Sequence, residues 1–287
     1  MIRTELLNNI MRKVKVFPSM SGTAAKVLAL LDDPDTSPSE IGGVLRYDPG
    51  LTANILKLTN SAYFGFASRI ASVNQAIVLL GSKRVVYLVM ASCVNAIMDE
   101  EVIGYDLPPG ELWRHSIAVS VAAEGLVKEL KLPANEEIFT AALLHDVGKL
   151  ILGYFVKEDL EKIESKAAEG LPFQEAERQV FGLDHAEVGA DILKNWSLPP
   201  KIVSAVRWHH DPDSAEEVSS LIDVVHVANV LCLMIGIGVG REGLHYEPSP
   251  SATKRLGLKP ASLEVVASQT LQWTNELVDV FESEKDI

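Results

Sequence analysis

The fold of this chain is decided by the stretch Ala141-Ala142-Leu143-Leu144-His145-Asp146-Val147-Gly148-Lys149. Apolar and small residues surround an adjacent histidine and aspartate, which is typical of a helix buried in a core. An unpaired Asp146 in that setting would cost on the order of several kcal/mol. The stretch therefore predicts a buried helix in which a divalent cation or a hydrogen-bonded partner offsets the carboxylate.

The rest of the chain also shows helical periodicity, with explicit start and stop signals. Ser37-Pro38-Ser39-Glu40 combines an N-cap serine, a proline at the first helical position and the glutamate of a capping box. Ser72-Val73-Asn74-Gln75 repeats the pattern, and Gly81 supplies a stop. Because no stretch shows the two-residue period of a strand, we expect an all-α fold of two packed helical subdomains. Their predicted bounds are residues 1–107 and 108–287, divided at Pro108-Pro109.

Composition limits the classes of protein to which the chain can belong. With 47% hydrophobic residues it can bury a sizeable core, and its net charge of -13 repels phosphate backbones and anionic lipids. We therefore expect no nucleic-acid partner. Only Cys93 and Cys232 occur, which suits two buried thiols in a reducing compartment, so we expect a cytoplasmic protein.

Two further segments need a separate interpretation. Residues 221–239 are apolar enough to raise a membrane span, but they contain Asp223, His226 and Asn229, so we predict a buried helix and no membrane association. Gly238-Val239-Gly240-Arg241-Glu242-Gly243 spells GxGxxG, the phosphate-binding pattern of dinucleotide folds. That pattern requires a preceding strand, and here a helix precedes it, so we do not interpret it as a nucleotide site.

Candidate metal ligands gather where the predicted helices begin or end. Glu111 and His115 are four residues apart on one helix, so their side chains leave the same face. The neighbours His145 and Asp146 diverge by roughly 100°, so one ion or a bridged pair can take both. The other members of the set are His185, which opens a helix, and His209 and His210, which close the helix that begins at Pro200.

The order of short motifs in this chain resembles the HDOD family, over about residues 16–211. In the first half these motifs are Phe17-Pro18, Thr23 to Leu31, Asp48-Pro49-Gly50-Leu51-Thr52, Asn60-Ser61-Ala62, Ala76-Ile77 and Leu80-Gly81. In the second half they are Leu144 to Lys149, His185 to Ala190, Trp196-Ser197-Leu198-Pro199 and His209-His210. The resemblance implies a bacterial signalling or output domain, generally non-catalytic, whose second subdomain is related to HD-type metal phosphohydrolases.

The metal-ligand pattern is also similar to that of the HD-GYP phosphodiesterases, which use two or three metals. The resemblance implies ligands at His115, His145, Asp146, His185, His209 and His210, with Glu111 beside them and Lys149 near a phosphate. The chain departs from that pattern at Asn229, where an aspartate would complete the first metal site, and in lacking a GYP segment after His209-His210. Mixed imidazole and carboxylate ligands predict one or two first-row divalent ions, with iron favoured over manganese, nickel or zinc.

Ordinary structural roles remain open for several of these residues. His226 is typical of a satisfied core histidine, with a role beside Asn229 as the alternative. The pair His145-Asp146 can also form a helix-end ion pair, and Glu111 can be a solvated carboxylate at a helix start. For Lys149, four residues beyond His145, the alternative is a plain surface charge.

Three functional hypotheses follow. The first is a metal-binding regulatory module with weak or no catalysis, whose signalling partners act in trans. The second is a metal-dependent phosphohydrolase acting on a nucleotide or cyclic dinucleotide, with Lys149 stabilising the developing charge. The third is a metal-free scaffold. Asn229 and the missing GYP segment favour regulation, whereas the retained residues His145, Asp146 and Lys149 favour chemistry.

Overall fold

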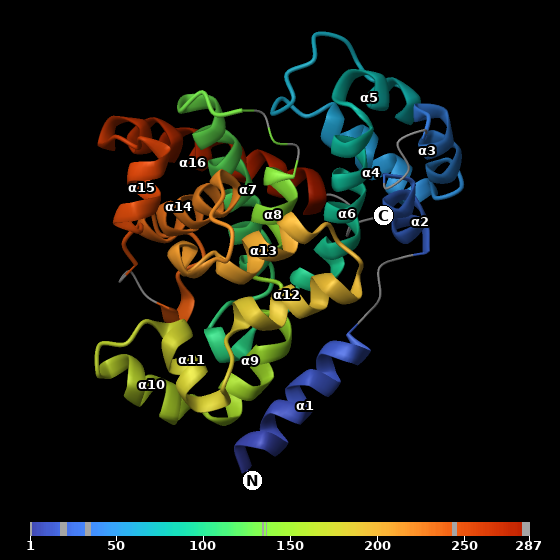
Figure 1. The fold of residues 1–287 in the computed structure, drawn as a ribbon. Helices are drawn as coiled ribbons and strands as arrows, with labels where there is room; N and C mark the ends of the chain where they lie inside the picture. Colours follow the sequence, from blue (N-terminus) through green and yellow to red (C-terminus); the bar gives the residue numbers. More distant parts are fainter. Residues whose placement is uncertain are drawn as a thin grey trace. The chain divides into compact units, whose positions relative to one another are not determined.

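A computed structural model describes the chain as a set of helices (Figure 1). The residues that it describes are 2–17, 22–31, 36–133, 135, 137–242 and 246–282. Among these residues there is no strand, and Val102 and Leu107 form an isolated antiparallel bridge. The predicted all-α fold is confirmed.

The chain divides into two compact units, each of which is discontinuous in sequence. Unit 1 contains Met1–Pro18 and Met98–Leu271, and unit 2 contains Ser19–Ile97 and Gln272–Ile287. The division predicted between residues 107 and 108 stays a prediction.

Unit 2 is built from short helices whose starts follow the sequence signals. They are α2 (Gly22–Leu31), α3 (Pro38–Leu45), α4 (Pro49–Thr59), α5 (Val73–Leu80), most of α6 (Ser82–Met98) and the end of α16 (Pro260–Glu282). The Ser37 hydroxyl accepts from the Glu40 backbone N–H, and the Glu40 side chain accepts from the Ser37 N–H, so the predicted capping box begins α3. The side chains of Asp48 and Ser72 cap α4 and α5 by accepting from the Leu51 and Gln75 backbone N–H groups.

Unit 1 holds the remaining helices and every candidate metal ligand. Its members are α1 (Ile2–Val16), α7 (Glu111–Glu129), α8 (Ile138–Leu144), α9 (Lys149–Glu158), α10 (Leu160–Ala168), α11 (Phe173–Phe181), α12 (His185–Asn195), α13 (Pro200–Trp208), α14 (Ser220–Met234), α15 (Pro250–Leu256) and the start of α16. Three short 3-10 turns, η1 (Ile103–Tyr105), η2 (Pro212–Ser214) and η3 (Gly240–Glu242), join them.

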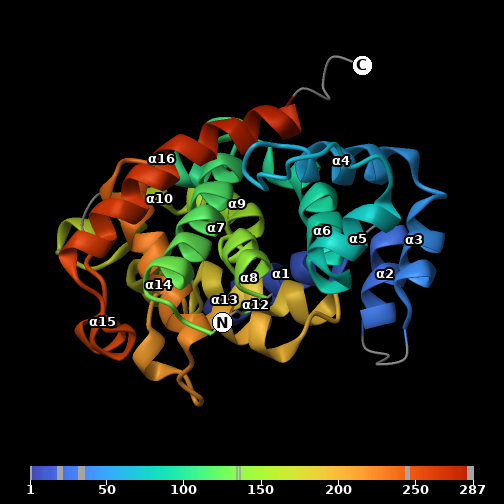
Figure 2. The same cartoon turned by 90° about the horizontal axis from the view of Figure 1, so that it is seen from above.

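Helices α7, α8 and α14 form the core of unit 1, and α7 packs along both of the others (Figures 1 and 2). Every residue of α8 is buried, as is every residue of α14 from Leu221 to Leu233. A helix that is apolar on all sides needs neighbours all round it. This burial agrees with the prediction of a core helix after residue 220.

One stretch of the described chain, Ile138–Glu158, is long and apolar enough to cross a membrane by length and composition. However, 89% of its apolar window is buried inside the protein. It is also interrupted between α8 and α9. Burial against other helices is the property of a core segment.

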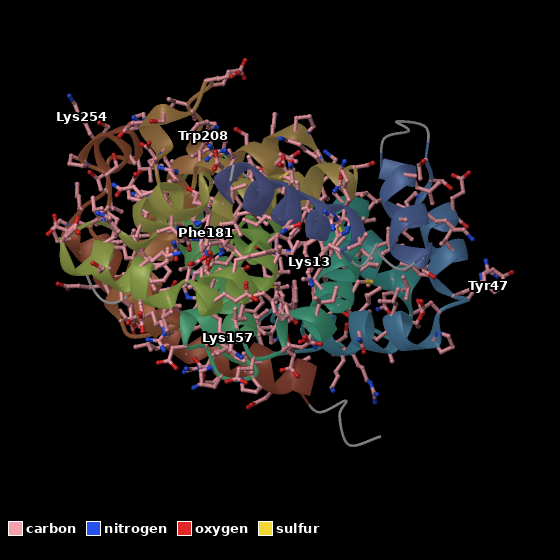
Figure 3. All side chains as sticks on the ribbon, turned by 90° about the horizontal axis from the view of Figure 1, so that it is seen from below. Lys13, Tyr47, Lys157, Phe181, Trp208 and Lys254 are labelled. Atoms are coloured by element: carbon pink, nitrogen blue, oxygen red, sulfur yellow. The ribbon has the colours of Figure 1, made fainter. Side chains whose placement is uncertain are left out.

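The surface of unit 1 is charged and its interior is filled by aromatic and aliphatic groups. Phe181 is fully buried at the end of α11, whereas Lys254 projects outward from α15 (Figure 3). Lys13 of α1 lies 5.2 Å from the ring centroid of Tyr154 on α9. This cation–π contact helps to hold α1 against the unit.

Candidate metal centre

The candidate site residues come from the ends of four helices and the interiors of two others. His145 and Asp146 directly follow α8, and Lys149 begins α9. His185 begins α12, where Asp184 and Glu187 form a capping box. The others are His209 and His210, which follow α13, His115 inside α7 and Asn229 inside α14. Helix ends suit this role, because the chain turns there and can direct adjacent side chains into one space.

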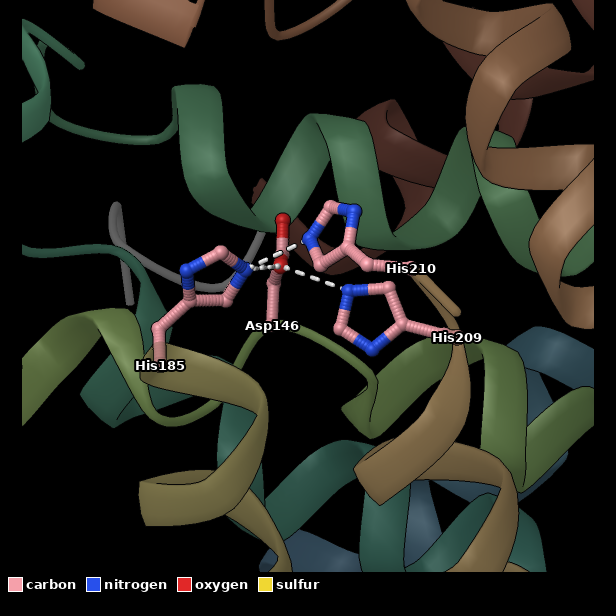
Figure 4. Close-up of side chains that lie close together, drawn as sticks. All are labelled: Asp146, His185, His209 and His210. Atoms are coloured by element: carbon pink, nitrogen blue, oxygen red, sulfur yellow. Dashed lines mark hydrogen bonds and ion pairs between the residues drawn. The ribbon is translucent and has the colours of Figure 1, made fainter. Parts of the chain in front are cut away.

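Asp146 lies at the centre of the cluster, with histidines on both sides of its carboxylate (Figure 4). Its Oδ2 atom is 3.2 Å from Nε2 of His145 and 3.5 Å from Nε2 of His115. Its Oδ1 atom is 3.4 Å from Nε2 of His185 and 3.7 Å from Nε2 of His209. The two oxygens therefore face two different sets of imidazoles.

These sets form two overlapping groups of donors. The first donor group is His115, His145 and Asp146, and the second is Asp146, His185, His209 and His210. Within each group the ligand atoms lie within 4.8 Å of one another. Two atoms that are each about 2.0–2.2 Å from one ion stand roughly 3–3.5 Å apart, close to the Asp146 distances above. The spacing in each group is compatible with one shared ion.

Unsatisfied polar atoms in this cluster support the same interpretation. Nδ1 of His145 donates to the Ala142 carbonyl at 2.7 Å, and Nδ1 of His209 donates to the Val206 carbonyl at 2.7 Å. Nε2 of each ring faces the cluster, and neither Nε2 atom has a hydrogen-bond partner. Oδ1 of Asp146 is buried and has none either. Buried acceptors of this kind require a cation or a donor.

His115 and Asn229 present a second unsatisfied contact. Burial and the charge of His145 lower the pKa of His115 to about 3, so its ring is neutral at pH 7. Because Nδ1 donates to the Ile237 carbonyl at 3.0 Å, the Nε2 lone pair points at Oδ1 of Asn229, 3.1 Å away. Two acceptors face each other there. A cation between them removes the conflict, as does rotation of the amide.

Glu177 of α11 is a functional residue that the sequence analysis missed. It is fully buried, and its carboxylate accepts from Nδ1 of His185 at 2.8 Å, from the His185 backbone N–H at 2.9 Å and from the Tyr105 hydroxyl at 2.5 Å. A carboxylate behind a ligand histidine fixes its tautomer and ring orientation. The available signal was spacing, because Glu177 lies four residues from both Phe173 and Phe181 and therefore on the apolar face of the helix.

The ionisation of His185 follows from this contact. Burial alone would lower the pKa of His185, but the Glu177 carboxylate outweighs burial and raises it to about 9. Burial and the neighbouring imidazoles of His209 and His185 hold the pKa of His210 well below its usual range. At neutral pH the cationic His185 therefore donates from Nε2 to Nε2 of His210, 2.8 Å away. An ion held by both Nε2 atoms must displace that proton.

This arrangement predicts how the stability of the metal-free protein depends on pH. The folded pKa of His185 lies above its ordinary value of 6.5, so its contribution is complete below that pH and is lost as pH rises through about 9. Its size is on the order of a few kcal/mol. In chelator-treated protein, we expect the melting temperature to fall between pH 7 and pH 10. The melting temperature of Glu177→Gln should change much less over the same pH range. If both proteins show the same change, Glu177 is not the cause of the raised pKa of His185.

Lys149 lies inside the cluster and not on the surface. It is 1% exposed, its Nζ donates to Oδ2 of Asp146 at 2.7 Å, and it sits 5.4 Å from the ring centroid of Tyr105. Burial alone would raise the pKa of Asp146, but His145 and Lys149 outweigh it and hold that pKa well below its usual range. The alternative of a surface charge is therefore wrong, and contact with a phosphate stays a prediction.

Two other residues have ordinary structural roles. Glu111 belongs to neither donor group, and its half-exposed carboxylate lies 3.7 Å from Arg114 one turn further along α7. His226 is buried and satisfied, since Nδ1 donates to the His209 carbonyl at 2.7 Å and Nε2 accepts from the Ser249 N–H at 2.8 Å. It supports the backbone of a candidate ligand.

Comparison with known proteins places this geometry in context. The model of the HDOD domain family matches residues 17–212. An uncharacterized protein of Treponema pallidum is 28% identical over 233 residues, which cover 79% of this chain and 44% of that protein. The chain spans less than half the length of the curated relatives that it matches.

Two crystal structures share the fold over nearly the whole chain. An HDOD domain protein of Geobacter sulfurreducens is 25% identical with a TM-score of 0.70, covering 99% of this chain and 94% of that one. A Shewanella amazonensis protein, named as a candidate phosphohydrolase, is 24% identical with a TM-score of 0.71 and covers 95% and 97%.

Proposed function

Because the chain belongs to the HDOD domain family, we propose that it is a bacterial regulatory module that binds a divalent metal and has weak or no catalytic activity. The observation that carries the proposal is the set of buried nitrogen and oxygen atoms without hydrogen-bond partners around Asp146. Such atoms are satisfied by an ion. The residues that would hold it are the two donor groups.

The burial of the candidate ligands favours a regulatory function over catalytic turnover. His115, His145, Asp146, His185 and His209 are each no more than 1% exposed. A phosphohydrolase has to admit a phosphate ester to its metal, whereas a structural ion needs no entrance of that size. Lys149 is also engaged by Asp146 at 2.7 Å, so its ammonium is directed at a carboxylate of the cluster. Asn229 adds a neutral oxygen where the hydrolytic relatives have a carboxylate.

The donor chemistry favours a first-row transition metal. Imidazole and carboxylate ligands suit iron, manganese, nickel and zinc, whereas calcium prefers oxygen ligands alone. We favour iron, with one ion or two, because the two oxygens of Asp146 face different donor groups. The bound ion would supply positive charge that links the helix ends. The partners in this proposal are cytoplasmic signalling proteins acting in trans, with a nucleotide as a further candidate ligand.

Elemental analysis tests the proposal directly. Purified protein should contain at least about one transition metal per chain, and metal returned after chelation should raise the melting temperature. Free ion at 100 times its Kd would add about 2.7 kcal/mol of stability. His145→Ala should lose the metal, whereas Glu111→Gln, from outside the donor groups, should keep it. Absence of both metal and a thermal shift would contradict the proposal.

The second candidate function is a metal-dependent phosphohydrolase. It is favoured by the buried grouping of His145, Asp146 and Lys149 and by the name of the Shewanella amazonensis relative. A bound ion would act there as a Lewis acid towards a phosphate ester. Metal-dependent turnover of a nucleotide or cyclic dinucleotide by the unaltered protein, abolished in His145→Ala, would establish this function instead.

Replacing Asn229 with aspartate tests whether its neutral amide weakens metal binding by the first donor group. Asn229→Asp places a second carboxylate within about 3 Å of His115 in a site that is 2% exposed. Without metal the new charge should destabilise the fold by a few kcal/mol, at most roughly 3–5. With metal it should add an anionic ligand and tighten binding. The difference in melting temperature between loaded and stripped protein should therefore increase, and an unchanged difference would refute this role for Asn229.

A further inference from the structure

The glycine-rich segment after α14 contacts the metal centre directly. We define the strap as Ile235–Glu242. Its Ile237 carbonyl accepts from Nδ1 of His115 at 3.0 Å, and the Ile237 side chain is 2% exposed. The GxGxxG pattern that begins at Gly238 therefore lies beside a metal-ligand candidate.

The strap lies so close to His115 and Tyr105 that it requires glycine at two positions. Gly238 has a φ of +71°, and a Cβ added there would stand 2.5 Å from the Cβ, Cγ and Nδ1 atoms of His115. Gly240 has a φ of +45°, and its added Cβ would stand 2.3 Å from the backbone oxygen of Tyr105. Any side chain would push the strap away from the site.

Residues 246–249 contact the second donor group. The ring of Tyr246 lies 5.6 Å from the ring of His210, and its hydroxyl donates to Gln174 at 2.9 Å. The Ser249 N–H donates to His226, whose other ring nitrogen donates to the His209 carbonyl. The strap therefore contacts the first donor group at His115, and residues 246–249 contact the second donor group.

The strap reaches the protein surface at Arg241. Nη1 of Arg241 lies 2.6 Å from Oε1 of Glu164 on α10. Arg241 is the only lysine or arginine in the sequence from residue 235 to residue 249. The Arg241–Glu242 peptide bond is therefore a single tryptic site that reports opening of the strap.

We propose that the strap closes over the metal centre and that metal occupancy sets the equilibrium between its closed and open states. This inference rests on the proposed function. An ion on Nε2 of His115 fixes the ring and strengthens the bond from Nδ1 to the Ile237 carbonyl. A fixed strap in turn holds His115 ready for metal, since coupling between two equilibria is reciprocal. The strap then presents metal occupancy to a partner as a change at the protein surface.

Limited trypsin digestion of the full chain tests the proposal, with Mn²⁺ as the probe. Cleavage after Arg241 separates residues 1–241 from 242–287. Where opening precedes cleavage, the rate follows the population of the open state, so loaded protein should be cut about tenfold or more slowly than stripped protein. A small synthetic trypsin substrate shows whether Mn²⁺ affects the protease itself.

Two glycine variants separate contact with His115 from backbone strain. Gly236 and Gly238 both have positive φ, +83° and +71°, but a Cβ at Gly236 meets nothing within 4 Å. Gly238→Ala should accelerate cleavage of the loaded protein and weaken Mn²⁺ binding. Gly236→Ala introduces the same kind of backbone strain without the contact with His115, so its effect in both assays should be clearly smaller than that of Gly238→Ala.

Elemental analysis of the same samples distinguishes failure of the strap proposal from failure of the proposed function. If the wild-type chain holds Mn²⁺ and is cut equally fast in both states, the strap proposal is overturned and the proposed function stands. If the wild-type chain holds no metal, the proposed function fails and the strap proposal falls with it.

Discussion

Asp146→Asn should abolish metal binding by both donor groups and destabilise the metal-free protein by roughly 3–5 kcal/mol. Asp146 contributes an oxygen to each group, so its loss removes the only carboxylate that they share. It is also the partner of Lys149, which is 1% exposed and 2.7 Å away. The substitution leaves that ammonium buried beside a neutral amide.

A double variant separates the two effects. Asp146→Asn combined with Lys149→Met removes both charges, so urea unfolding should recover most of the lost stability while the metal content stays near zero. The matched control is Asp191→Asn, whose carboxylate pairs with Lys194 at the same three-residue spacing and at 2.8 Å, but on the surface. Its cost should stay below about 1 kcal/mol. A comparable loss in Asp191→Asn, or no recovery in the double variant, would contradict this account.

Glu177→Gln should weaken metal binding by the second donor group by roughly 10–100-fold. The carboxylate accepts from both the backbone and Nδ1 of His185, and it raises the pKa of that ring to about 9. An amide can rotate to offer its NH₂ to Nδ1, which would reverse the tautomer and spoil Nε2 as a ligand. The effect passes through orientation, because Glu177 belongs to neither donor group.

Calorimetric titration with Mn²⁺ in buffers of different ionisation enthalpy measures both affinity and proton release. The parent should release a proton at pH 7 as metal displaces the one between His185 and His210, and Glu177→Gln should release much less. Glu175→Gln on the same helix, where the carboxylate pairs with Arg178 and is partly exposed, should match the parent. If Glu177→Gln also matches the parent, Glu177 does not position His185.

The sequence predicted the helices well where local chemistry decides them. Ser37 and Ser72 cap helices at the expected residues because a cap depends only on the next three residues. The discontinuous units could not be predicted in the same way. Residues 272–287 belong with residues 19–97, and no local signal records which distant segments pack together.

The candidate site, too, could be predicted only in part from the sequence. The histidines and Asp146 could be identified from their order along the chain, which resembles a family pattern. Burial of Lys149 and Glu177 could not, because a charged residue on a helix is usually solvated and only its tertiary neighbours show otherwise. No local signal predicts the contact of Gly238 with His115, because it depends on packing between α7 and the segment after α14.

The ligands around Asp146 run from residue 115 to residue 210, so an ion held by them would act as a cross-link between distant parts of the chain. A cross-link that closes a long loop lowers the conformational entropy of the unfolded chain more than one that closes a short loop. During synthesis such a cross-link cannot form until residues 209 and 210 have left the ribosome and joined the folded helices. Metal acquisition would then come late in the folding of unit 1, after the helix ends that carry the ligands have packed together.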